Sequence, residues 1–380
     1  MNRPRVCFVV ESGTDVRLVE GLIEICELTI LARKIKGGVE ISQPPSKFVR
    51  IRVGPSARLQ FAWFAWRNLW AEKHGFDIFL VQGYGVAALA ANLAGRLVHK
   101  PVIMLVCSPT EAYYRCRMSN PDGATPYRRH KAWLLDMLAH VNAKLAGEYV
   151  VLSKYLAEVV RAHGARSPIH VVPVYGVDTQ IFVPPGEPRC AIRARLNLPT
   201  TGALILFSSR IAPEKDSEAL LRAVRRLLES GRDIWLLHRS GGYKAFLRDA
   251  ERFGIVHRVI ASDAVHPHRQ LAPDYQACDL CVQASREEGL GFSPLEALAC
   301  ATPVIAAAVG GLKETIVDGR TGWTYSVGDA EGLARCIKAV LDDPAEAARR
   351  AFTGRSIVRT RYDRRFVFRQ LAGILAEVLQ

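Results

Sequence analysis

The chain has 380 residues, of which 49% are hydrophobic and 23% are charged, and its formal net charge is +14. This length exceeds what one hydrophobic core usually supports, so we expect two domains. No run of about 18 apolar residues occurs, which argues against a membrane-spanning helix. The nine cysteines are odd in number and several lie in apolar runs, as is typical of a reduced, cytoplasmic chain.

The positive charge comes mostly from arginines that are spread along the chain without long runs. Neither an aromatic–basic RNA motif nor a helix-turn-helix is present, so we expect no nucleic-acid partner. Two explanations stay open: a solvated, arginine-rich surface, or attraction to an anionic lipid surface or acidic acceptor. Cys278 and Cys281 have C-x2-C spacing, but no second ligand pair follows. We therefore interpret them as buried residues and expect no zinc there.

In the first half of the chain, short apolar runs alternate with longer amphipathic stretches. The apolar runs predict strands at 6–10, 28–31, 48–53, 78–82, 102–106, 149–153 and 169–174. The amphipathic stretches predict helices at 16–26, 86–98 and 132–146. This alternation is typical of a parallel sheet covered by helices on both faces.

Tryptophans recur at helical spacing within 59–75, at Trp63, Trp66 and Trp70, with Arg67 and Lys73 nearby. An aromatic helix with basic flanks can lie in a membrane interface. More often such a stripe packs on its own sheet, and we favour that packing. Peripheral contact with the anionic inner face of the cell membrane stays open as the alternative.

A segment rich in proline and glycine, 176–189, lacks periodicity and predicts a linker. The alternation then restarts, with strands predicted at 203–209, 234–238, 257–261, 280–284 and 303–307, and helices at 217–231, 295–301, 330–343 and 364–379. We therefore predict an α/β protein with two doubly wound, Rossmann-like domains facing across a cleft. Their predicted bounds are 1–175 and 190–360, followed by a closing helix within 361–380 that could pack back on the first domain.

Two carboxylates, Glu288 and Glu296, bracket a glycine-containing turn that follows a predicted strand and enters a predicted helix. Pro294 fits the first turn of that helix, where its missing N–H leaves no helical bond unmade. We expect Glu288 on the loop, Glu296 about one turn into the helix, and the amides of 290–293 between them. Such amides attract phosphate, whereas carboxylates bind sugar hydroxyls. The pattern therefore favours a nucleotide-sugar.

Two cations, Arg210 and Lys215, follow the first predicted strand of the second half and share one loop. At the carboxyl end of a strand they suit a diphosphate, although a loop often carries such residues on its surface. Gly310 and Gly311 also follow a predicted strand, either for close approach to a ligand or for a tight turn without one. Gly13 follows the first strand, but G-x-G-x-x-G, P-loop, H-E-x-x-H, G-x-S-x-G and D-x-D motifs are absent.

Four segments, 149–160, 173–184, 208–215 and 287–323, resemble in their order and spacing the retaining glycosyltransferases of family 4, which have the two-domain GT-B fold. The resemblance covers 149–330 strongly and the first half weakly. It implies that Glu288 contacts donor-sugar hydroxyls, that Glu296 contacts the ribose, and that Arg210 and Lys215 hold the pyrophosphate. The other donor-side residues that it implies are Gly13, Leu290, Gly291, Phe292, Ser293, Gly310 and Gly311.

The chain also departs from the family pattern. Many members have a histidine after an N-terminal strand that touches the primary hydroxyl of the donor sugar, and Cys107 and Ser108 stand there instead. A pentose, a 6-deoxy sugar or an altered hexose pose is therefore open. Ser209 and Asp216 stand where family members often have glycine, and neither difference removes the charge of Arg210 or Lys215. The nearby stretch predicts the acceptor side, or else an ordinary helix start with aromatics in the core; its residues are Ser108, Glu111, Tyr113, Tyr114, Arg115 and Arg117.

The resemblance thus implies a hexosyl- or pentosyltransferase that needs no metal or other cofactor. It would move a sugar with retention from a nucleotide diphosphate donor, UDP or GDP first, to a hydroxyl of a glycan, glycolipid or small metabolite. A polar or anionic acceptor suits the predicted residues. The alternatives are another GT-B enzyme, such as a nucleotide-sugar epimerase or a sucrose-synthase-like enzyme, and a catalytically silent nucleotide-sugar-binding protein.

Overall fold

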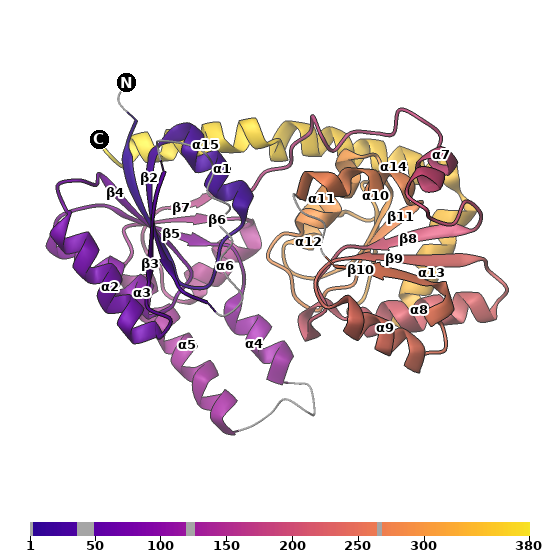
Figure 1. The fold of residues 1–380 in the computed structure, drawn as a ribbon, viewed down its shortest axis with the longest axis horizontal. Helices are drawn as coiled ribbons and strands as arrows, with labels where there is room; N and C mark the ends of the chain where they lie inside the picture. The colour runs from indigo at the N-terminus through magenta and orange to yellow at the C-terminus, as the bar shows by residue number, and fades with distance from the viewer. Residues whose placement is uncertain (1–2, 36–48, 119–125, 264–267) are drawn as a thin grey trace. The chain divides into compact units, whose positions relative to one another are not determined.

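The computed structural model describes residues 3–35, 49–118, 126–263 and 268–380, with backbone alone at 126–132. The chain divides into two compact units, each with its own parallel sheet (Figure 1). Unit 1 comprises Met1–Gly176 and Arg364–Gln380, and unit 2 comprises Val177–Asp363. The predicted linker therefore differs from the structure, because from Val177 onward it belongs to unit 2.

The sheet of unit 1 has seven strands in the order β3-β2-β1-β4-β5-β6-β7. Its strands are β1 (Arg5–Val10), β2 (Glu27–Arg33), β3 (Val49–Gly54), β4 (Ile78–Gln82), β5 (Val102–Val106), β6 (Glu148–Val151) and β7 (Ile169–Val171). The inner strands are continuous apolar runs because helices bury both of their faces. The strand order reverses between β1 and β4, and such a point in a parallel sheet opens a crevice at the strands' carboxyl ends.

The helices of unit 1 are α1 (Val16–Ile25), α2 (Arg58–Ala71), α3 (Val86–Leu97), α4 (Thr110–Met118), α5 (Pro126–Leu145), α6 (Lys154–Ala162) and α15 (Arg364–Glu377). The closing helix α15 lies against α1 (Figure 1). Phe368 packs so tightly over Gly21 that an added Cβ would lie 1.9 Å from its ring, and Arg364 pairs with Glu24 at 2.8 Å. These contacts hold the end of the chain in unit 1.

The favoured interpretation of the tryptophan stripe is wrong. The face of α2 that packs inward carries Phe61, Ala65 and Leu69, which are fully buried. Trp63 and Trp70 are instead 66% and 45% exposed. Phe61, Ala65 and Leu69 recur every four residues and the tryptophans every three to four, so helical spacing alone could not show which set is buried.

The sheet of unit 2 has six strands in the order β10-β9-β8-β11-β12-β13. Its strands are β8 (Ala203–Phe207), β9 (Ile234–Arg239), β10 (Val259–Ser262), β11 (Leu280–Gln283), β12 (Val304–Ala307) and β13 (Trp323–Tyr325). Its helices are α7 (Arg189–Arg195), α8 (Ser217–Glu229), α9 (Tyr243–Arg252), α10 (Ala272–Ala277), α11 (Phe292–Ala299), α12 (Leu312–Thr315), α13 (Ala330–Asp342) and α14 (Pro344–Ile357). Short 3-10 turns occupy Pro213–Lys215, Val256–Arg258 and His268–Leu271, and a π turn occupies Val358–Tyr362.

The prediction of two Rossmann-like parallel sheets is confirmed. Several strands end earlier than predicted, and after β6 the reason is a helix cap. Ser153, for example, was expected in a strand, but its hydroxyl accepts a hydrogen bond from the Leu156 amide and caps α6. The sequence did not predict β13, α6, α7, α9, α10 or α14, and it placed the start of α5 six residues too late.

Candidate functional site

The loop between β11 and α11 is shaped by one glycine at the helix start. Gly291, the N-cap of α11, has φ +90°, which a residue with a side chain rarely adopts. A Cβ there would also lie 2.5 Å from the Leu312 side chain. Because Gly291 offers no capping side chain, the first turn of α11 presents main-chain N–H groups of Phe292 and Ser293, as an anion-binding helix end does.

Glu288 stands on this loop and holds Lys215, which comes from 73 residues earlier in the chain. Lys215 Nζ lies 2.5 Å from Glu288 Oε2, and both residues are at least nine-tenths buried. Gln283 Nε2 and Ser285 Oγ donate to the same carboxylate oxygen at 3.1 Å each. A buried, hydrogen-bonded pair of this kind fixes the position of both charges.

The second predicted cation, Arg210, stands on the same turn as Lys215 but is 56% exposed at its side chain. It pairs with the fully buried Glu214 at 2.8 Å. Asp216, which follows Lys215, has φ +46° and starts α8. Its carboxylate pairs at 3.0 Å with Arg286, a residue of the β11–α11 loop. Within unit 2 the structure thus brings the turn that carries Arg210 and Lys215 into contact with the β11–α11 loop that carries Glu288.

Glu296 is the fifth residue of α11 and is 1% exposed. Its Oε1 lies 2.6 Å from His268 Nε2, and Tyr275 Oη donates to its Oε2 at 2.9 Å. Burial, followed by the charge of Glu296, raises the pKa of Tyr275 well above its usual range, so the phenol keeps its proton and donates it. The hydroxyls of Ser208 and Ser293 each lie 3.0 Å from the same phenol oxygen.

The glycine pair after β12, Gly310 and Gly311, contacts the backbone of the loop that carries Glu288. The Gly311 amide donates to the Glu288 carbonyl at 3.0 Å. A Cβ on Gly311 would lie 2.1 Å from the Gly289 carbonyl oxygen, and Gly310 has φ +47°. The structure thus shows a close approach of Gly311 to the backbone of this loop, and the predicted contact with a ligand stays a prediction.

Two family models match the chain, one on each unit. The model described as glycosyl transferases group 1 matches residues 189–356, and the model described as glycosyl transferase 4-like domain matches residues 16–174. The first contains the Lys215–Glu288 pair, and together they cover most of the chain. The chain belongs to glycosyltransferase family 4.

Curated relatives of this family 4 chain include proteins named D-inositol 3-phosphate glycosyltransferase. The one from Xylanimonas cellulosilytica is 35% identical over 233 residues, which are 58% of this chain and 53% of that protein. The one from Kineococcus radiotolerans is 36% identical over 222 residues, 51% of this chain and 50% of that protein. The chain thus spans about half the length of the curated relatives it matches.

Solved structures similar to this family 4 chain include two that match over nearly its full length. Sucrose-phosphate synthase from Thermosynechococcus elongatus has a TM-score of 0.79 at 21% identity, covering 98% of this chain and 99% of that one. Anabaena HepE in complex with UDP-glucose has a TM-score of 0.77 at 18% identity, covering 99% and 100%. At these identities the comparison shows a shared fold, and the expected GT-B fold is confirmed.

Several residues that hold the family 4 site together did not stand out in the sequence. His268 and Tyr275 come from a 3-10 turn and a short helix, α10, that no periodicity indicated. Gln283 and Ser285 had a usable signal, since they are polar residues at the end of an otherwise apolar strand. Arg286 directly precedes the segment that begins at Glu287, and no pattern in the sequence singled it out.

The predicted acceptor residues of the family 4 chain lie at the start of α4 and along it. Glu111 is 7% exposed, and its Oε1 is buried without a hydrogen-bond partner among the described residues. Tyr113 and Tyr114 are half-buried rather than in the core, and Arg115 is exposed. The remaining members are Ser108, whose hydroxyl lies 3.5 Å from that of Thr110, and the half-buried Arg117.

Four further positions that the sequence singled out carry no charged side chain. Gly13 has φ +90° and open space where a Cβ would lie, so its freedom is conformational. Burial raises the pKa of Cys107 to about 12, and the thiol stays neutral. Cys278 and Cys281 are both fully buried, and burial raises the pKa of Cys281 to about 12. The structure thus agrees that these two cysteines are interior thiols.

Proposed function

We propose that this chain is a retaining glycosyltransferase that takes its sugar from a nucleoside diphosphate donor. The observation that carries the proposal is the buried Lys215–Glu288 pair beside the N-terminus of α11. A cation and helix amides suit a diphosphate, whereas a carboxylate suits sugar hydroxyls. UDP is the first nucleotide to test, because HepE has been crystallised with UDP and with UDP-glucose.

In the proposed reaction the bond from the sugar's anomeric carbon to the phosphate oxygen breaks as a bond to the acceptor oxygen forms on the same face. The acceptor's proton passes to the departing phosphate oxygen. Negative charge grows on the diphosphate, and Lys215, Arg210 and the amides at the start of α11 stabilise it. Fixed charge of this kind contributes about 10²–10³-fold per donor. We propose that no metal takes part, so chelators should leave transfer unchanged well below the melting temperature.

For the acceptor we propose a small anionic polyol, such as an inositol phosphate. The curated relatives are named for an inositol phosphate, and the last turn of α4 carries Arg115 and Arg117. Guanidinium groups bind phosphate in a bidentate manner. Comparing inositol phosphate with unphosphorylated inositol as acceptor tests this directly, and equal rates would remove the role of the phosphate.

Two rivals differ from this proposal in their products. An epimerase would isomerise the donor sugar without any acceptor. A silent binding protein would bind the nucleotide-sugar and leave it intact. Thermal-shift screening against UDP-, GDP-, ADP- and dTDP-sugars identifies the donor first, because a selective ligand stabilises by mass action. Mass spectrometry of the products with and without acceptor then separates the three.

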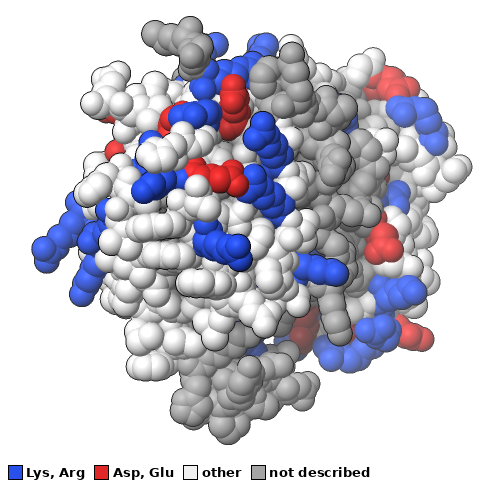
Figure 2. Space-filling view, turned by 60° about the vertical axis from the view of Figure 1, so that its left-hand side comes forward, with Lys and Arg blue, Asp and Glu red and all other residues white. Residues whose placement is uncertain are grey.

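We also propose that α2 rests on an anionic membrane surface. None of the described helices is long and apolar enough to cross a bilayer. Leu59 and Trp63 of α2 are 75% and 66% exposed, and they line a surface hollow of about 550 Å³ with Arg67. Figure 2 brings this side of the molecule forward and shows lysine and arginine side chains among mostly uncharged ones. Exposed aromatics with basic neighbours suit a lipid interface.

Liposome co-sedimentation tests the membrane contact. We expect binding to anionic vesicles, weaker binding to zwitterionic ones, and loss of binding in Trp63→Ser. Phe352→Ser is the matched control, since Phe352 is 55% exposed but lies in unit 2. Absence of binding to anionic vesicles, or an equal loss in both variants, would remove α2 as the contact.

A further inference from the structure

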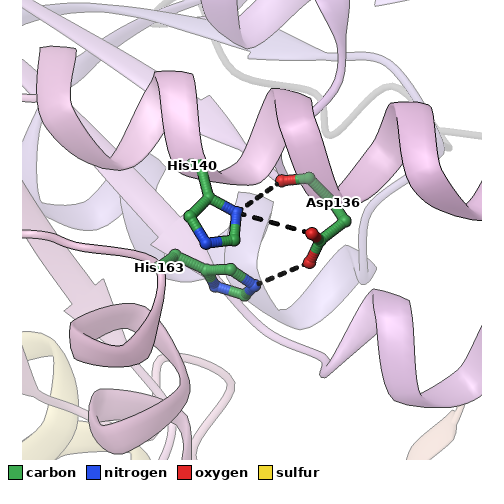
Figure 3. Close-up of side chains that lie close together, drawn as sticks. All are labelled: Asp136, His140 and His163. Atoms are coloured by element: carbon green, nitrogen blue, oxygen red, sulfur yellow. Dashed lines mark hydrogen bonds and ion pairs between the residues drawn. The ribbon is translucent and has the colours of Figure 1, made fainter.

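Away from the residues discussed above, unit 1 holds a cluster of three side chains of the kinds that bind transition metals (Figure 3). Asp136 and His140 lie one turn apart on α5 and so share a face, and His163 ends α6. Each offers one ligand atom, and these atoms all lie within 4.8 Å of one another. Within the described ranges this is the one group of three or more such residues.

The distances in this cluster are close to those of a tetrahedral metal site. His140 Nδ1 lies 3.7 Å from one Asp136 carboxylate oxygen, and His163 Nε2 lies 3.8 Å from the other. Neither is short enough for a hydrogen bond. Ligands bound at about 2.0–2.1 Å in a tetrahedron lie about 3.4 Å apart. Small side-chain rotations would therefore bring the three onto one ion.

The cluster is held in this arrangement by a hydrogen bond within α5. His140 Nδ1 lies 2.8 Å from the Asp136 carbonyl oxygen, and since a carbonyl accepts, the nitrogen donates. This bond turns the ring toward the carboxylate (Figure 3). A metal bound at Nδ1 would replace it. The loss is small, because a single neutral hydrogen bond is weak beside metal–ligand bonds.

A second observation concerns His163, which is 7% exposed. Its Nδ1 is buried and has no hydrogen-bond partner among the described residues, and the same holds for Glu111 Oε1. Burial lowers the pKa of His163, while the nearby Glu111 carboxylate acts to raise it. Metal-binding histidines commonly donate their second ring N–H to a carboxylate. A metal on Nε2 would fix the proton on Nδ1, and the Glu111 carboxylate, whose charge already acts on this ring, would have to rotate to accept it.

We propose that Asp136, His140 and His163 bind one zinc ion, with water as the fourth ligand. Two imidazoles and one carboxylate with an open position form a typical zinc set. The ion would tie α5 to the end of α6 and stabilise unit 1. Its three ligands belong to unit 1, whereas the proposed diphosphate-binding residues Arg210, Lys215 and α11 belong to unit 2.

The test uses the full chain, without a histidine tag and freed of metal by a chelator. We expect one equivalent of zinc to bind in isothermal titration and to raise the melting temperature by mass action. His140→Ala should weaken zinc binding at least tenfold and abolish the temperature shift. Asp136→Asn, which keeps the side-chain shape, should also weaken binding. His74→Ala removes an exposed imidazole outside the cluster and should bind zinc as the wild type does.

Cobalt substitution identifies the ligands. The proposal predicts a tetrahedral cobalt spectrum without the near-ultraviolet band of a cobalt–thiolate bond, lost in His140→Ala. A thiolate band would place the ion on cysteine and overturn the proposal. So would equal zinc affinity in wild type and His140→Ala, or no zinc binding at micromolar concentration.

Discussion

At the scale of single residues, the proposed function depends most on Lys215 and Glu288. The sequence was enough to place a cation and a carboxylate on two predicted loops. What the sequence could not show is that Lys215 Nζ lies 2.5 Å from Glu288 Oε2, because the two segments meet through the fold of unit 2. The same holds for Glu296, whose partners His268 and Tyr275 come from a 3-10 turn and a short helix without a periodic pattern. Residue types and loop positions were thus predictable, but the pairings were not.

Replacing Lys215 with alanine should lower kcat/KM for transfer by about 10²–10³-fold, because a fixed cation no longer meets the growing diphosphate charge. Lys338→Ala is the control, since Lys338 lies 60% exposed on α13. Circular dichroism should show that both variants fold. Near-normal transfer by Lys215→Ala would remove the lysine from the diphosphate site.

Glu288→Gln keeps the shape of the side chain and removes its charge. Hydrogen bonds to charged groups contribute about 1.5–3 kcal/mol, so kcat/KM should fall by about ten- to a hundredfold. The Kd of the free nucleoside diphosphate, measured by titration calorimetry, should change much less. Glu331→Gln, at an exposed position of α13, should leave both quantities unchanged. An equal loss of nucleotide affinity in Glu288→Gln would mean that Glu288 acts through Lys215 on the diphosphate rather than on the sugar.

Gly311→Ala should displace the Glu288 loop, because its Cβ would lie 2.1 Å from the Gly289 carbonyl oxygen. Overpacking of this kind costs about 1–3 kcal/mol, so both the melting temperature and donor affinity should fall. Gly373→Ala is the matched control. Gly373 is an exposed residue of α15 with open space around it, and alanine there should stabilise the helix. Wild-type donor affinity in Gly311→Ala would show that the close approach does not position the loop.

At the scale of elements, the helices and strands that could be predicted are those whose burial gives a regular pattern of apolar residues. The strands β4 and β5 were predicted at their observed bounds because each is a continuous apolar run between turn residues. The three-residue β13 is too short for a pattern, and α14 carries few apolar residues with which to show one. The stripe of α2 was misassigned because Phe61, Ala65 and Leu69 recur as regularly as the tryptophans.

The docking of α15 on α1 gives a prediction at this scale. Phe368 is 2% exposed and lies over Gly21, so Phe368→Ala should lower the free energy of unfolding of unit 1 by about 3–5 kcal/mol. Phe366→Ala, on the same helix but 39% exposed, should cost much less. Limited proteolysis followed by mass spectrometry locates the loosened part of the chain. Equal effects of the two variants would contradict this packing.

At the scale of the whole molecule, the chain passes between the units at two neighbouring points. Val177 pairs with Asp363 in an isolated bridge, and the Val177 amide donates to the Tyr362 carbonyl at 2.7 Å. The sequence indicated a break near 176–189 from proline and glycine content. It could not place the boundary at residue 177, because the pairing partner lies nearly 190 residues later.

We propose that this chain transfers a sugar from a nucleoside diphosphate with retention of configuration at the anomeric carbon. Nuclear magnetic resonance of the product formed from an α-linked donor and an inositol phosphate acceptor tests it most directly. We expect an α-linked product and one nucleoside diphosphate released per sugar transferred. A β-linked product, or an isomerised sugar formed without acceptor, would contradict it.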